Sequence, residues 1–174
     1  LQQLQHLECL PARYRILELS SELRDRQRAT LADEVPELLP RVDWVDDMPE
    51  PGWEGVVLAN EVLDAMPVSR FRIQGSDILE QFVTSTEEGF ALAWDRPRSE
   101  GLVEAVESLF PQGLPDDYES EINLRLSPWL ATLWGCMDEG LVLLIDYGYG
   151  RSADYHPQRH RGTLICHYRH RADE

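Results

Sequence analysis

The stretch GVVLANEVLDAMP at residues 55–67 is the feature that most constrains the fold of this chain. Its first five residues are apolar and predict a strand, which stops abruptly at Asn60 and Glu61. We expect a short helical turn carrying Asp64 to follow and to end at Pro67. Ligands of an open α/β sheet bind just beyond the carboxyl ends of its strands, so this edge is a candidate site. The alternative is that Asn60 only caps the next helix and that the acids are solvated.

A second strand end carries another acid. Residues 13–20 predict a short strand that leads into a helix over residues 21–31, with Ser20 or Ser21 as its cap. Glu18 lies at the junction, where nucleoside-binding sites hold a carboxylate that accepts hydrogen bonds from ribose hydroxyls. Taken alone, such a glutamate is more often an ordinary surface acid.

The remaining segments complete a mixed α/β pattern. Residues 141–145 are continuously apolar and predict a strand buried on both faces, which ends at Asp146. Further strands are predicted at 42–45, 68–74, 78–84 and 89–94, and helices at 100–110 and 118–137. The short connections between residues 68 and 95 imply antiparallel pairing, a β-meander. The whole indicates a doubly wound α/β domain, with the meander inserted into it or extending it.

The charge of the chain excludes several functions. The formal net charge is −16, which disfavours a nucleic-acid binder and permits a basic protein as partner. All 16 basic residues are arginine, and the absence of lysine excludes a Walker-A site and Schiff-base chemistry in these residues. No apolar run is long enough to span a bilayer. Three scattered cysteines without a CxxC motif indicate a reducing, cytoplasmic setting.

The histidine-rich end of the chain raises the possibility of a zinc site. Its candidate ligands are His156, His160, Cys166, His167 and His170. A strand predicted over residues 162–166 would send Cys166 and His167 to opposite faces, so we predict no metal site. Serine hydrolase chemistry is also unsupported, because the chain has no GxSxG motif.

Several segments, taken together, resemble the MidA family. The most specific is Asn-Glu-x-x-Asp-Ala-x-Pro at residues 60–67, and the others are YRILELS at 14–20 with Leu23, Arg24 and Gln27, then IDYG at 145–148, and GTL at 162–164 with His170. The family comprises class I S-adenosylmethionine-dependent methyltransferases of bacteria and mitochondria, whose mitochondrial members act in assembly of respiratory complex I. The resemblance places the glycine-rich first loop upstream of Leu1. We therefore expect residues 1–174 to form a single, partial, Rossmann-like methyltransferase domain, with residues 68–95 as the meander insertion.

The resemblance implies methyl transfer to an arginine of a protein substrate, for which a complex I subunit is one candidate. It implies S-adenosylmethionine as cofactor. Glu61 and Asp64 would orient the guanidinium and accept its proton, because residues three apart on a helical turn share one face. The implied cofactor-binding residues are Glu18 at the ribose, Trp44 or Val45 near the adenine, and Asn60 at the amino-acid end. Tyr147 would line the substrate entrance.

Two other functions compete with this one. The first is a non-catalytic assembly or scaffold protein that keeps the methyltransferase fold. The second is a nicotinamide-dependent oxidoreductase, because Glu18 would serve the ribose of NAD equally well. The acidic edge from Asn60 to Asp64 and the resemblance weigh against the oxidoreductase.

Overall fold

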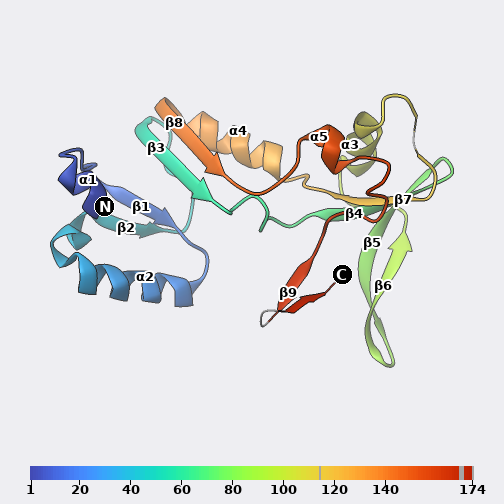
Figure 1. Cartoon of the computed structure of the whole chain (residues 1–174), viewed down its shortest axis with the longest axis horizontal. Coiled ribbons are helices and arrows are strands. Elements are labelled where there is room, and N and C mark those ends of the chain that lie inside the picture. The colour runs from blue at the N-terminus through green and yellow to red at the C-terminus, as the bar shows by residue number, and fades with distance from the viewer. Residues whose placement is uncertain (114, 169–170, 174) are drawn as a thin grey trace. The chain divides into compact units, whose positions relative to one another are not determined.

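The computed structural model describes residues 1–113, 115–168 and 171–173 of the chain (Figure 1). The chain divides into two compact units, Leu1–Glu54 with Thr132–Glu139 and Gly55–Ala131 with Gly140–Glu174. Strand β3 (Trp53–Asn60), helix α4 (Leu126–Cys136) and strand β8 (Met137–Ile145) contribute residues to both. In the part of the chain that is described, no helix is long and apolar enough to cross a membrane.

The first unit contains a parallel strand pair, β1 (Tyr14–Leu17) and β2 (Val42–Val45). Helix α2 (Ser21–Glu34) and the 3-10 helix η1 (Pro36–Arg41) connect the two strands, and α1 (Gln2–His6) precedes them. A parallel pair needs such a crossover, because its strands start at the same edge. The predicted strand, helix and second strand are therefore confirmed. The helix runs to Glu34, beyond the predicted end.

The second unit is built on a four-stranded antiparallel sheet in the order β6-β5-β4-β7. Its strands are β4 (Ser69–Gln74), β5 (Asp77–Thr86), β6 (Gly89–Asp95) and β7 (Tyr118–Ile122). Helix α3 (Leu102–Leu109) packs on one face through Leu102 and Val106, both fully buried. The core cluster consists of Phe71, Ile73, Ile78, Leu102, Val106 and Tyr118. The predicted meander is confirmed.

Strands β3 and β8 form a separate two-stranded sheet. Backbone hydrogen bonds from Gly52 N to Cys136 O (3.0 Å) and from Glu61 N to Ile145 O (2.8 Å) have the same sequence separation, as a parallel pair requires. Figure 1 shows the two arrows side by side and pointing in one direction. The fold is thus a partial, Rossmann-like α/β core with an antiparallel insertion, as predicted.

Four local predictions were wrong. Residues 118–122 form strand β7 rather than the start of a helix, because they pair with β4 from Ser69 to Ile73. Strand β8 is not buried on both faces, since Leu141, Leu143 and Ile145 are each about half exposed. Residues 162–165 are not a strand, and the tail instead contains helix α5 (Arg151–Asp154) and the antiparallel pair β9 (Cys166–Tyr168) and β10 (Arg171–Asp173).

The fourth wrong prediction concerns the segment after Asn60. It forms bends and turns instead of a helical turn, and one backbone bond runs from Met66 N to Leu63 O (3.2 Å). Glu61 has a left-handed φ of +51°, which a right-handed helix cannot accommodate. The alternative in which Asn60 caps a helix therefore fails, and so does the expectation that Glu61 and Asp64 share one helical face.

Candidate functional site

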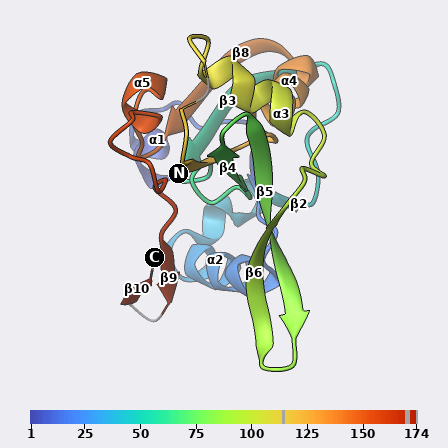
Figure 2. The same cartoon turned by 90° about the vertical axis from the view of Figure 1, so that its right-hand side faces the viewer.

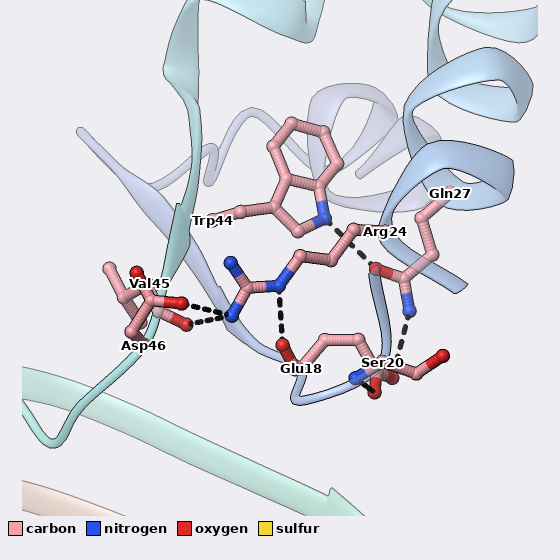
Figure 3. Close-up of polar contacts among 7 residues, drawn as sticks. All are labelled: Glu18, Ser20, Arg24, Gln27, Trp44, Val45 and Asp46. Carbon is pink, nitrogen blue, oxygen red and sulfur yellow. Dashed lines mark hydrogen bonds and ion pairs between the residues drawn. The ribbon is translucent and has the colours of Figure 1, made fainter. Parts of the chain in front are cut away.

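In the first unit, Glu18 follows β1 and its carboxylate is held by two donors. Its Oε1 accepts a hydrogen bond from the backbone N–H of Ser20 (2.9 Å), and its Oε2 accepts one from the side-chain amide of Gln27 (3.4 Å; Figure 3). Ser20 also caps α2, because its hydroxyl accepts from the N–H of Leu23 (3.3 Å). One β-to-α junction thus fixes both the helix start and the direction of the glutamate.

Arg24 ties the ends of β1 and β2 together. Its Nε donates to the carbonyl of Glu18, and its Nη2 donates to the carbonyl of Val45 (3.0 Å) and pairs with Asp46 (2.7 Å; Figure 3). The guanidinium is largely shielded, with 20% of the side chain exposed. The rigid fork of an arginine suits such a bridge between two loops. The sequence indicated Arg24 and Gln27 only as parts of a family resemblance, and their spacing of three on one helix face was the available signal.

Trp44 is linked to Glu18 through the side chain of Gln27. Its indole N–H donates to the side-chain carbonyl oxygen of Gln27 (2.9 Å), so one amide holds both Trp44 and Glu18 (Figure 3). The Arg28 guanidinium lies 4.7 Å from the indole centroid. Val45 is half-buried and contributes its carbonyl to Arg24. A flat apolar ring beside a half-buried carboxylate with lone pairs to spare fits an aromatic base and a sugar diol.

In the second unit, the end of β3 presents polar side chains to solvent. Asn60, Glu61 and Asp64 are exposed, and no hydrogen bond joins their side chains to other described residues. The backbone, in contrast, is fixed. Glu61 donates its N–H to the carbonyl of Ile145, which ties the end of β3 to the end of β8.

Asp146 holds the loop that follows. Its Oδ2 accepts from the N–H groups of Leu63 (2.8 Å) and Asp64 (3.3 Å), although these residues are more than eighty positions away in sequence. Its Oδ1 is buried and has no partner among the described residues. The sequence identified Asp146 as an acid at a strand end and missed this anchoring role. Tyr147, the next residue, is 81% exposed.

The structure therefore gathers the predicted site residues into two groups. Glu18, Trp44 and Val45 meet through Gln27 and Arg24, and Glu61 and Asp64 lie in one loop fixed by Asp146. Of the histidine-rich tail, His156 and His160 are exposed. The side chains of Cys166 and His167, and all of His170, lie outside what the structure describes.

The partial Rossmann-like core, with acids at the ends of its parallel strands, defines an α/β protein of the class I methyltransferase type. Over residues 1–174 the chain matches the family described as "Putative S-adenosyl-L-methionine-dependent methyltransferase". The chain belongs to this family, which confirms the MidA-type resemblance read from its motifs.

Known relatives agree with this assignment. The chain is similar to the protein arginine methyltransferase NDUFAF7 homolog, mitochondrial, of Caenorhabditis elegans, with 31% identity over 121 residues that cover 66% of the chain and 27% of the relative. It is also similar to a COG1565 superfamily protein of Burkholderia thailandensis, whose crystal structure contains S-adenosyl-homocysteine. That comparison gives a TM-score of 0.86 and 38% identity, covering 98% of this chain and 43% of the other. Comparison with a native structure of a COG1565 superfamily protein from the same organism gives a TM-score of 0.87 and 38% identity. The match covers 99% of this chain and 45% of the other. The chain thus spans less than half the length of each relative.

Proposed function

We propose that this protein is an S-adenosylmethionine-dependent methyltransferase that modifies an arginine side chain of a protein substrate. The observation that carries the proposal is the Glu18 carboxylate, held by Ser20 and Gln27 beside the Trp44 indole. Such a carboxylate can accept hydrogen bonds from both ribose hydroxyls. The relative of known structure that contains S-adenosyl-homocysteine, at 38% identity, supports the same cofactor class.

The proposed cofactor contacts are shared among four residues. Glu18 would bind the ribose, Trp44 and Val45 would pack near the adenine, and Asn60 would donate to the amino-acid end. S-adenosylmethionine supplies a methyl group on a sulfonium, which is an activated electrophile. Arg24 and Gln27 touch only protein groups here and would position Glu18 and Trp44.

The exposed acids of the second unit are suited to a guanidinium. A guanidinium is protonated at neutral pH, so its nitrogen is a poor nucleophile until a proton leaves. Carboxylates of Glu61 and Asp64 would bind the fork, orient one nitrogen and accept the released proton. Tyr147, exposed directly after Asp146, would line the substrate entrance. The printed name of the nematode relative, a protein arginine methyltransferase homolog, supports arginine as the target.

The wider assignments belong to the same proposal. Residues 1–174 would act as one partial methyltransferase domain, in which residues 68–95 are an insertion. The partner would be a protein, with a subunit of respiratory complex I as one candidate, and the setting would be the bacterial cytoplasm.

The test is methyl transfer by the protein in its natural full length. Isotopically labelled S-adenosylmethionine is incubated with lysate from cells that lack the protein, and the labelled amino acid is identified by mass spectrometry after hydrolysis. We expect methylarginine, and we expect its loss in the Asp64→Ala variant. Label on another amino acid would contradict the arginine assignment. Failure to bind S-adenosyl-homocysteine, with partner binding retained, would instead establish the scaffold alternative.

A further inference from the structure

The hairpin of the antiparallel sheet extends beyond the strands that support it. Strand β5 pairs with β4 only from Asp77 to Glu80, and with β6 from Glu80 to Thr86. Glu80 is therefore the one β5 residue with a partner on both sides. Beyond it, residues 81–94 form a two-stranded ribbon, which Figures 1 and 2 show projecting past β4. We call residues 81–94 the ribbon.

One face of the ribbon is apolar and open to solvent. Val83 lies opposite Leu92, and Ser85 lies opposite Phe90, so these side chains share a face. Val83 is 68% exposed, Leu92 63% and Phe90 88%. At the base of the ribbon the same face ends at Trp94, whose ring is covered by the Arg72 guanidinium at 4.3 Å. Apolar side chains in a row with this exposure indicate an interaction surface.

The outer edge of β6 lacks the usual protection against strand pairing. The sheet order places β6 at the end, with no further strand beyond it in the described residues. Edge strands are normally blunted by lysine, proline or inward-pointing charges, and residues 89–94 are Gly, Phe, Ala, Leu, Ala and Trp. A two-stranded ribbon alone is marginally stable in water. Its backbone and its apolar face are both available for an added strand.

The ribbon itself carries only acidic charge, whereas three arginines contact its base: Arg72 lies over Trp94, Arg98 lies over Phe82, and Arg70 donates to Gln81. Residues 74–95 contain five acids and no base. Two of these acids are occupied: Glu80 accepts from the N–H groups of Arg98 (2.7 Å) and Ser99 (2.9 Å), and Asp95 pairs with Arg98 (2.8 Å). Burial opposes ionisation of Glu80, but hydrogen bonds from Ser99 and Arg98 outweigh it and lower its pKa. Glu87 and Glu88 remain exposed at the ribbon tip, separated from Phe90 by Gly89.

We propose that the ribbon is a docking arm that binds an extended, arginine-containing segment of the protein substrate by adding it as a strand to the outer edge of β6. Main-chain hydrogen bonds would supply affinity, and alternate side chains of the segment would lie on Phe90 and Leu92. The aliphatic stem of an arginine can cover these apolar groups while its guanidinium reaches Glu87 or Glu88. The choice of a substrate rests on the proposed function, whereas the binding mode rests on the ribbon alone.

The test uses a defined peptide as probe. A fluorescently labelled heptapeptide of alternating valine and arginine is titrated into the full-length protein, with a valine–glutamate heptapeptide as its control. Hydrogen exchange is measured over residues 81–94 with and without the peptide. We expect the arginine peptide to bind, the glutamate peptide not to bind, and exchange to slow along β6.

Two variants and a matched control make the test specific. Leu92→Lys places a charge on the apolar face and should weaken binding of the arginine peptide by about tenfold. The exposed pair Glu87→Gln and Glu88→Gln should weaken it about threefold without affecting folding. Val103→Lys adds the same charge at an exposed position of α3 and should change nothing.

Several outcomes would overturn the docking arm. Equal binding of both peptides, or unchanged exchange in the ribbon, would do so. A dimer in sedimentation that Leu92→Lys dissociates would mean that a second copy occupies the edge. A ribbon already protected in the free monomer would mean that the protein covers it internally. S-adenosyl-homocysteine binding is measured in parallel and should be normal in Leu92→Lys. Loss of cofactor binding in the wild type would count against the proposed function, whereas loss of peptide binding alone would count against the docking arm.

Discussion

The two polar strand ends of this protein are organised in opposite ways. After β1, the carboxylate of Glu18 is fixed by Ser20 and Gln27, and the guanidinium of Arg24 binds the main chain on either side. After β3, the main chain of Leu63 and Asp64 is fixed by Asp146, and the side chains of Asn60, Glu61 and Asp64 stay exposed. One end fixes a side chain, and the other fixes only the backbone beneath its side chains.

The difference suits the two tasks that we propose. A cofactor with an invariant nucleoside is best bound by groups already held in place, because no ordering cost is added on binding. A guanidinium from a protein segment arrives in variable surroundings, and free carboxylates on a fixed loop can adjust to it. Substitutions at each strand end test whether the two ends can be impaired separately.

The largest effect is expected at Asp64. The Asp64→Ala variant should lower methyl transfer by about a hundredfold or more, because a group that orients the guanidinium and accepts its proton is lost. Its side chain is exposed and makes no hydrogen bond or ion pair with another described residue, so thermal unfolding should stay at the wild-type temperature. The measurement is a methylation rate beside a melting curve. A large drop in melting temperature would make Asp64 structural.

Glu18 should give the next largest effect, and of a different kind. Glu18→Ala should raise the KM for S-adenosylmethionine about thirtyfold, equivalent to the loss of one charge-assisted hydrogen bond, with little change in kcat at saturation. Glu18→Gln keeps one acceptor oxygen, so its KM should lie between those of Glu18→Ala and the wild type. Steady-state kinetics of both variants check this. An unchanged KM would remove Glu18 from the cofactor site.

Asp146 should affect stability and the second strand end together. Asp146→Ala leaves the N–H groups of Leu63 and Asp64 without their acceptor and should lower the free energy of unfolding by about 2 kcal/mol. Asp146→Asn retains a carbonyl oxygen, so its free energy of unfolding should fall by less than half as much as that of Asp146→Ala. Urea unfolding measures the difference. Equal stability of both variants and the wild type would show that the loop containing Leu63 and Asp64 does not need the hydrogen bonds to Asp146.

The smallest effect is expected at Gln27. Gln27→Ala removes the amide that holds Trp44 and Glu18, while both of these side chains remain. The affinity for S-adenosyl-homocysteine should fall about threefold through lost positioning. Gln27→Glu, which can still accept from the indole, serves as the matched comparison. If Gln27→Ala is as severe as Glu18→Ala, Gln27 itself contacts the cofactor.

Much of the fold was predictable from local patterns. The strands β1 and β2, the helix α2 and the meander follow from apolar alternation, a serine cap and short glycine turns, all of which act over a few residues. Residues 118–122 misled the prediction, because their apolar spacing continues that of α4. Their strand conformation comes from pairing with β4, which no local pattern encodes.

The residues of the candidate site were predictable from the sequence, but the hydrogen bonds that position them were not. Acids at strand ends identified Glu18, Glu61 and Asp146 from the sequence alone. The hydrogen bonds from Leu63 and Asp64 to Asp146 join segments far apart in the chain and displace the expected helical turn. The exposure of β8 could not be predicted either. An apolar run predicts a strand, but it does not show whether other elements cover both faces of that strand.

The division of labour between the two strand ends has one direct test. S-adenosyl-homocysteine is titrated by calorimetry into the full-length wild type, Glu18→Ala and Asp64→Ala under one set of conditions. We predict that Glu18→Ala weakens binding by about tenfold or more, whereas Asp64→Ala binds as the wild type does. Weakened binding in Asp64→Ala with normal binding in Glu18→Ala would contradict the assignment of Glu18 to the cofactor and of Asp64 to the substrate.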